Sequence, residues 1–160
     1  MAKVVLLSCT KSKLDKPAPA QELYSPSPMF QKTLKYGQSL KPDKMFILSA
    51  KHHLVPMTKE LAPYDMTLKE MSKDEKEAWA EETVKQMKSH GLDPQKDKFV
   101  FLTGSEYMKP LFKYIPESNI EKPMEGKRMG ERLKWLNSQI QKLQELFNKV
   151  KNIIYECLSK

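Results

Sequence analysis

The chain of 160 residues has little cysteine and no long hydrophobic run. Its two cysteines, Cys9 and Cys157, lie near opposite ends, which excludes a disulfide framework and a paired metal-ligand motif and fits a reducing compartment. The longest apolar runs, such as residues 4–7, are too short to span a bilayer. The first residues lead directly into a strand pattern and not into a signal peptide. We therefore expect a cytoplasmic protein with no membrane partner.

Arginine is also scarce, since only Arg128 and Arg132 occur among the 28 basic residues. The 28 basic and 20 acidic residues leave a net charge of +8. Such an excess favours an acidic partner, and nucleic acid or a nucleotide is the commonest one. A lysine-rich solvated surface explains the same charge, so both interpretations stay open.

Three short segments rich in apolar residues predict buried strands, at residues 3–8, 44–49 and 98–103. Helical patterns alternate with them, at residues 27–39, 72–90 and 106–113. The second of these begins with a capping box formed by Ser72 and Glu75. This alternation predicts an α/β fold with a small, mostly parallel sheet flanked by helices. Ligands of such sheets bind at the carboxyl ends of the strands.

A long apolar stripe follows near the end of the chain, with spacings of three and four residues. It consists of Leu133, Leu136, Ile140, Leu143, Phe147, Val150, Ile154 and Cys157. The stripe predicts a helix over residues 127–158 and divides the chain into an α/β domain (1–126) and an amphipathic helix (127–160). This helix packs on the domain or on the same helix of another subunit, which would make a homo-oligomer. We favour the domain, because such a stripe also serves as an ordinary core face.

The first candidate cluster follows the first strand, within a loop predicted over residues 10–28. Ser8, Cys9, Lys11 and Lys13 combine hydroxyl donors, a thiol and positive charge, and Tyr24, Ser25 and Ser27 complete the cluster. Such groups suit a phosphate or a polarised base. Four prolines and many small polar residues exclude a continuous helix here, and loops of this length are usually functional. A buried Cys9 among solvated lysines is the structural alternative.

The second candidate cluster follows the second strand. Ser49, Lys51, His52, Tyr64 and Asp65 include groups used for proton transfer or amine attack. We expect Lys51 and His52 to point into a partly desolvated pocket. A histidine that only pins the loop by hydrogen bonding is the alternative. No third ligand stands at a diagnostic spacing from the histidine pair, so we expect no metal.

The third candidate cluster is Gly104, Ser105 and Tyr107, at the start of a helix after the third strand. Gly104 allows close backbone approach, and Ser105 can cap the helix and leave N–H groups free for an anion. Capping alone explains these residues equally well. The chain has no P-loop, no dinucleotide fingerprint and no Gly-x-Ser-x-Gly elbow, so we expect no cofactor.

Together these clusters resemble the family of the peroxide-stress protein YaaA and its smaller phage and bacterial relatives of unassigned function. The resemblance extends over residues 3–136. Its motifs are the strand at 46–49 followed by Leu54, Pro56 and Pro63-Tyr64-Asp65, and the turn from Leu102 to Tyr107. The opening pattern of Cys9, Lys11, Lys13 and Tyr24-Ser25-x-Ser27 is similar to the smaller relatives. More distantly, it resembles a Cys, Lys, Tyr, Ser motif in the core domain of archaeosine synthase.

The resemblance implies an association with nucleic acid. YaaA proteins bind DNA and limit oxidative DNA damage, and archaeosine synthase modifies a deazaguanine base in tRNA with a lysine amine. His53 stands where the smaller relatives usually carry glycine, which predicts a different loop backbone at this position.

Three hypotheses for the function follow. The first is an enzyme that modifies or removes a nucleobase in DNA or RNA. The second is a non-catalytic DNA-binding protein of a stress or phage-related system, and the third is a subunit whose C-terminal helix mediates assembly. For the enzyme, the candidate catalytic residues are Cys9, Lys11, Lys13, Lys51, His52 and Asp65, and the candidate substrate-binding residues are Ser8, Tyr24, Ser25, Ser27, Ser49, Tyr64, Gly104, Ser105 and Tyr107.

Overall fold

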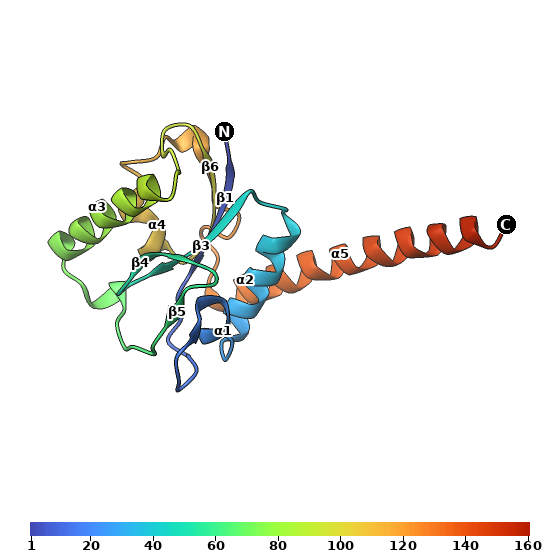
Figure 1. The fold of residues 1–160 in the computed structure, drawn as a ribbon, viewed down its shortest axis with the longest axis horizontal. Helices are drawn as coiled ribbons and strands as arrows, with labels where there is room; N and C mark the ends of the chain where they lie inside the picture. The colour runs from blue at the N-terminus through green and yellow to red at the C-terminus, as the bar shows by residue number, and fades with distance from the viewer.

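The computed structural model describes residues 1–160 and shows an α/β fold around a five-stranded sheet (Figure 1). The strands are β1 (Lys3–Ser8), β3 (Lys44–Ser49), β4 (His53–Pro56), β6 (Lys98–Leu102) and β7 (Ile120–Glu121). Their order in the sheet is β4-β3-β1-β6-β7. All neighbours are parallel except β3 and β4, which form a hairpin. The predicted mostly parallel sheet is confirmed.

β1 forms the centre of the sheet because its apolar residues are covered on both faces. Its four residues at 4–7 are fully buried. In the parallel pairings, Leu6 lies between Phe46 of β3 and Phe101 of β6. A strand that is covered on both faces needs apolar side chains on both faces. This explains why residues 4–7 are all apolar and do not alternate with polar residues.

The two long helices of the domain both begin at serine caps, of which the Ser72 capping box was predicted. In α2 (Pro28–Ser39), the Phe30 N–H donates to the Ser27 hydroxyl, and α3 (Lys73–Ser89) begins with the Ser72 capping box. Figure 1 shows α3 on one side of the sheet and α2 on the other. Gly37 lets α2 approach the sheet closely, since a Cβ there would lie 3.0 Å from the Val5 side chain. The helices therefore enclose the strands from both faces.

Two loop regions differ from the expectations. The predicted loop over residues 10–28 contains a short strand, β2 (Ala18–Pro19), and one helical turn, α1 (Ala20–Leu23); β2 pairs with β5 (Glu60–Leu61). The helix expected at residues 106–113 is split into α4 (Ser105–Met108) and a 3-10 turn, η2 (Lys109–Leu111). The split occurs at Pro110, which has no N–H to continue an α-helix. Two more 3-10 turns are η1 (Leu68–Glu70) and η3 (Glu117–Asn119).

The β3–β4 hairpin contains His53 in the left-handed region, with φ at 64°. Glycine adopts this conformation with the least strain. His53 therefore adopts a backbone conformation that glycine usually occupies.

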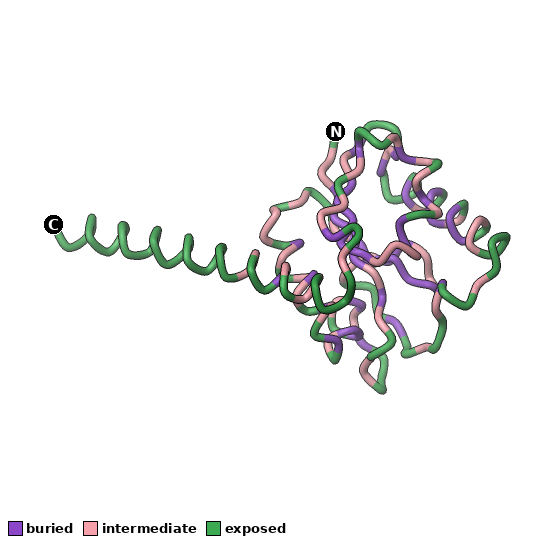
Figure 2. The backbone as a smooth tube through the Cα atoms, turned by 180° about the vertical axis from the view of Figure 1, so that it is seen from behind, coloured by how far each residue is buried: buried purple, intermediate pink, exposed green.

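α5 (Met129–Leu158) is the long helix predicted for the end of the chain. Its first turns pack on α2, where the Trp135 ring meets Tyr36 edge-on at 5.1 Å and Leu136 is fully buried. Residues 141–158 are all exposed and project away from the domain (Figure 2). The preferred expectation, a stripe packed on the domain along its whole length, is therefore wrong for residues 141–158. None of the helices combines the length and apolar content that a membrane crossing requires.

Candidate functional site

The three predicted clusters converge at one edge of the sheet, as the parallel arrangement requires. The Cys9 N–H donates to the Leu48 carbonyl, 2.9 Å away, which joins the end of β1 to the end of β3 beside Ser49. The Cys9 thiol donates to the Tyr107 hydroxyl, at 3.2 Å, which joins it to the turn after β6. Cys9 and Gly104 also line one cavity. The ends of β1, β3 and β6 therefore lie together, as the parallel arrangement predicts.

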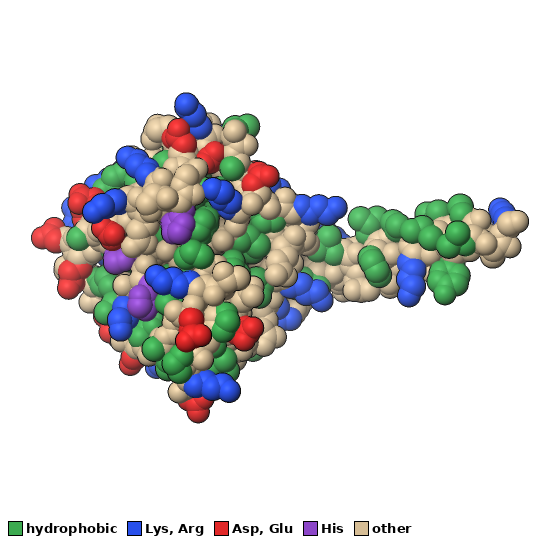
Figure 3. Space-filling view, viewed as in Figure 1, with side chains coloured by type: hydrophobic (Ala, Val, Ile, Leu, Met, Phe, Trp, Pro, Cys, Tyr) green, Lys and Arg blue, Asp and Glu red, His purple; other side chains and the backbone are tan.

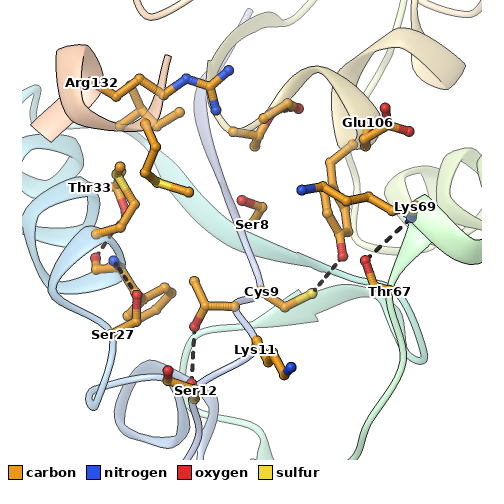
Figure 4. Close-up of a pocket in the computed structure, with 18 of the residues that line it drawn as sticks. Ser8, Cys9, Lys11, Ser12, Ser27, Thr33, Thr67, Lys69, Glu106 and Arg132 are labelled. Carbon is orange, nitrogen blue, oxygen red and sulfur yellow. Dashed lines mark hydrogen bonds between the residues drawn. The ribbon is translucent and has the colours of Figure 1, made fainter. Parts of the chain in front are cut away.

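This cavity has a volume of about 660 Å³ and lies between the strand ends, the start of α2 and the start of α5 (Figure 4). Eight of the predicted site residues line it: Ser8, Cys9, Lys11, Lys13, Ser27, Asp65, Gly104 and Tyr107. Seven do not: Tyr24, Ser25, Ser49, Lys51, His52, Tyr64 and Ser105. The first and third clusters therefore form most of the wall, and the second contributes through Asp65.

Lys13 is the half-buried amine of the cavity. Its ammonium donates to the Thr10 carbonyl at 2.8 Å and lies 4.4 Å from the centre of the Tyr64 ring. Burial lowers the pKa of Lys13, while Cys9 and Asp65 act in the opposite direction because negative charge there favours the ammonium. An amine in this setting is uncharged more often than a solvated lysine, and the uncharged form is the nucleophile.

Three hydroxyl groups form a chain behind Lys13. The Tyr64 hydroxyl shares one hydrogen bond with Tyr24 and another with Ser49, each at 2.7 Å. Burial raises the pKa of Tyr24 to about 12 and also raises the pKa of Tyr64, so both rings keep their protons at neutral pH. The Trp79 indole donates to the Ser49 carbonyl at 2.9 Å and anchors the end of the chain. These residues support Lys13 from outside the cavity wall.

The second cluster contains the main correction. Lys51 is exposed in the β3–β4 turn, and neither Lys51 nor His52 lines the cavity. The His52 N–H donates to the Ser49 hydroxyl at 3.0 Å, and its ring meets Tyr64 edge-on at 5.4 Å. Burial and then the Lys51 charge lower the pKa of His52. The prediction that both side chains point into the cavity is therefore wrong. The hydrogen bond that holds the turn comes from the His52 backbone N–H and not from its imidazole.

The residues matched by a family model extend from 4 to 138. The model is that of a Family of unknown function (DUF6884). The chain belongs to this family. No curated protein and no solved structure matches the chain. Every residue that lines the cavity lies inside the matched region, whereas the projecting residues 141–158 lie outside it.

Several residues of the DUF6884 cavity were not predicted from the sequence. Figure 4 shows Arg132 of α5 on one side of the cavity and Lys69 and Glu106 across from it. A Cβ on Gly104 would lie 3.4 Å from Arg132 Nη1, so the glycine leaves room for this guanidinium. The position of Glu106, beside the predicted Ser105 and Tyr107, was a usable signal. Arg132 could have been singled out because it is one of only two arginines in the chain.

The charged groups of the cavity are mixed. Four basic and three acidic side chains line it: Lys11, Lys13, Lys69, Arg132, Asp65, Glu70 and Glu106. Glu106 forms an ion pair with Lys76 at 2.9 Å, so its charge is already compensated. The balance that remains in the DUF6884 cavity is positive. Nowhere in the chain do three or more His, Cys, Asp or Glu side chains form a group that could hold a metal ion.

Proposed function

We propose that this DUF6884 domain is an enzyme that acts on a nucleobase or nucleotide, with Lys13 as its amine nucleophile. The observation that carries the proposal is a half-buried Lys13 with a lowered pKa, set in a cavity at the carboxyl ends of three parallel strands. Groups in a cavity whose pKa is shifted are candidates for chemistry, because catalysis at neutral pH needs groups that titrate near that pH.

The dimensions of the cavity support a small ligand or a single extruded base. Its volume of about 660 Å³ lies within the range of roughly 300–1,000 Å³ that is typical of ligand pockets. Enzymes that modify a base in a nucleic acid bring that base out of the stack and into such a pocket. A duplex would meet only the rim.

The basic residues at the rim support a phosphate-bearing substrate. Lys11 and Lys69 are exposed at the cavity, and Arg132 reaches it from α5. Lysine contributes a point charge, while the planar arginine group can bind two phosphate oxygens at once. Lys13 is then left for the reacting centre, because it is more enclosed than Lys11 and Lys69.

The chemistry available to Lys13 is nucleophilic attack. Its Nζ lone pair would form a bond to an electrophilic C=N or C=O carbon of the substrate, while the π bond opens and its electron pair moves onto that nitrogen or oxygen. The proton lost from Nζ would pass through Asp65 or water to the same heteroatom. Cys9 holds its thiol toward Tyr107, next to the same cavity, and is the second candidate for substrate contact. Lys51 and His52 have no part in this proposal.

The charge on one face of the molecule gives no support to a purely electrostatic DNA-binding protein. On the face seen in Figure 3, basic and acidic side chains are interspersed and form no continuous basic stripe. A protein that binds DNA mainly through phosphates gathers its lysines and arginines on one face. The charge of +8 still helps a nucleic acid to approach.

The test is mass spectrometry of the nucleosides obtained from DNA and RNA of cells with and without the protein. We expect one nucleoside to change with the wild-type protein and to stay unchanged with Lys13→Met. Lys16→Met is the matched control, since Lys16 is an exposed lysine of the same loop that does not line the cavity. An unchanged set of nucleosides, or full activity of Lys13→Met, would overturn the proposal. Salt-dependent DNA binding without any changed nucleoside would instead identify the non-catalytic alternative.

A further inference from the structure

The projecting part of α5 exposes an apolar face that the domain does not cover. Phe147 is 63% exposed and Ile154 is 52% exposed, and Leu143, Leu146, Val150 and Ile153 lie on the same face. Figure 3 shows apolar side chains along this part of the helix. Over 18 residues it extends about 27 Å at 1.5 Å per residue. A soluble helix with such a face normally has a partner that buries it.

We propose that residues 141–158 pair antiparallel with the same segment of a second copy, about a twofold axis between Asn148 and Lys149. In this register each core layer joins two apolar side chains. Phe147 meets Val150 of the second copy, Leu143 meets Ile154 of the second copy, and Ile140 meets Cys157 of the second copy. Symmetry repeats each layer once, so one segment supplies both sides of the interface.

The residues beside these layers also fit the pairing. On one flank Leu146 lies near Ile153 of the second copy, which widens the apolar interface. On the other flank Gln144 lies near Lys151 of the second copy, and no two like charges face each other. The segment is therefore complementary to itself in its apolar contacts, and its flanks bring no like charges together.

The fold of the domain selects the antiparallel direction. The same face of α5 that projects beyond Ile140 is covered by α2 in the first turns, where Leu136 is buried and Lys32 donates to the Asn137 side chain. In a parallel pair, the first turns of the second helix would need the space that α2 occupies. In the antiparallel pair, the second helix ends at Leu158, next to Ile140, where the cover by α2 stops. The two domains then lie at opposite ends.

The exposed Cys157 makes it possible to measure whether the two helices pair parallel or antiparallel. In the proposed pair the two Cys157 residues lie about 25 Å apart along the axis, at 1.5 Å per residue. A disulfide needs Cα atoms within about 7 Å of each other. A parallel pair in register would bring the two Cys157 side chains together, while Cys9 is buried and takes no part.

The experiment combines oxidative crosslinking of the full chain with its mass in solution. We expect a dimer of twice 18.6 kDa, no disulfide-linked dimer of the wild type, and an efficiently linked dimer of Ile140→Cys through Cys157 of the second copy. Adding Cys157→Ser to Ile140→Cys should abolish the link. Crosslinking of the wild type through Cys157 would overturn the antiparallel direction.

A second variant separates pairing from folding. Phe147→Asp should give a monomer with an unchanged domain, and Asn152→Asp, on the opposite face of the helix, should stay a dimer. Circular dichroism checks the fold of both. A wild type that remains monomeric at its highest soluble concentration would overturn the proposal. So would a wild-type monomer that binds vesicles of anionic phospholipid through this face, because a membrane surface would then be the partner.

Discussion

The α/β domain and the projecting half of α5 carry similarly apolar segments, but only the domain buries them. Residues 4–7 are covered on both faces by the neighbouring layers, whereas Phe147 and Ile154 of α5 meet solvent. Both apolar patterns are regular, and both the predicted strand and the predicted helix form. The difference lies in the surface that is available to cover them. An apolar pattern therefore specifies an element and a face, but its partner depends on the rest of the fold.

The largest effect should come from placing a charge in each region in turn. Ile47 of β3 is fully buried, so Ile47→Asp should cost more than about 4 kcal/mol and unfold the domain. Phe147→Asp should leave the stability of the monomeric domain within about 0.5 kcal/mol of wild type. Urea unfolding of dilute protein measures both. Equal destabilisation by the two changes would mean that the projecting segment belongs to the domain core.

An effect of intermediate size should show that the α/β domain, and not the projecting part of α5, sets the pH dependence of the activity. Lys13 gains its reactive, uncharged form as the pH rises through its lowered pKa, so activity should rise with pH and then level off. Asp65 holds this pKa up, and Asp65→Asn should move the rise to lower pH. Deleting residues 141–160 should leave the pH dependence of the activity unchanged. The pH dependence of the nucleoside change gives the comparison, and an unmoved profile in Asp65→Asn would argue against Lys13 as the titrating group.

The smallest effect compares two glycines of the helices. A Cβ on Gly37 would lie 3.0 Å from the side chains of Val5 and Met45, so Gly37→Ala should destabilise by about 1–3 kcal/mol through overpacking. A Cβ on Gly130 would meet nothing within 4 Å, so Gly130→Ala should stabilise the start of α5 by up to about 1 kcal/mol. Thermal unfolding measures whether each substitution lowers or raises the stability. A gain in stability from Gly37→Ala would show that α2 can move away from the sheet.

The predictions from sequence succeeded where local chemistry decides the structure. β1 and β3 begin and end at the predicted residues, because apolar runs of this length in a small α/β domain have few alternatives. The capping box of α3 follows from the Ser72 hydroxyl and the Glu75 carboxylate three residues later. The convergence of Cys9 and Gly104 follows from parallel strands alone.

The same reasoning failed where distant parts of the chain meet. Nothing local distinguishes Lys13 from Lys51, since both follow a buried strand among polar residues. The β3–β4 hairpin turns Lys51 into solvent, while the loop after β1 folds Lys13 against the Tyr64 ring. Arg132 reaches the cavity only because α5 crosses α2 beside Gly104.

For this protein the sequence by itself determined the three central strands, the capping box of α3, the long final helix and the edge at which polar groups gather. These features depend on the backbone and on side chains a few residues apart. The tertiary structure decided which amine is enclosed and where the domain stops covering α5. Both depend on surfaces that come together only on folding, because desolvation is a property of the assembled neighbours and not of the residue alone.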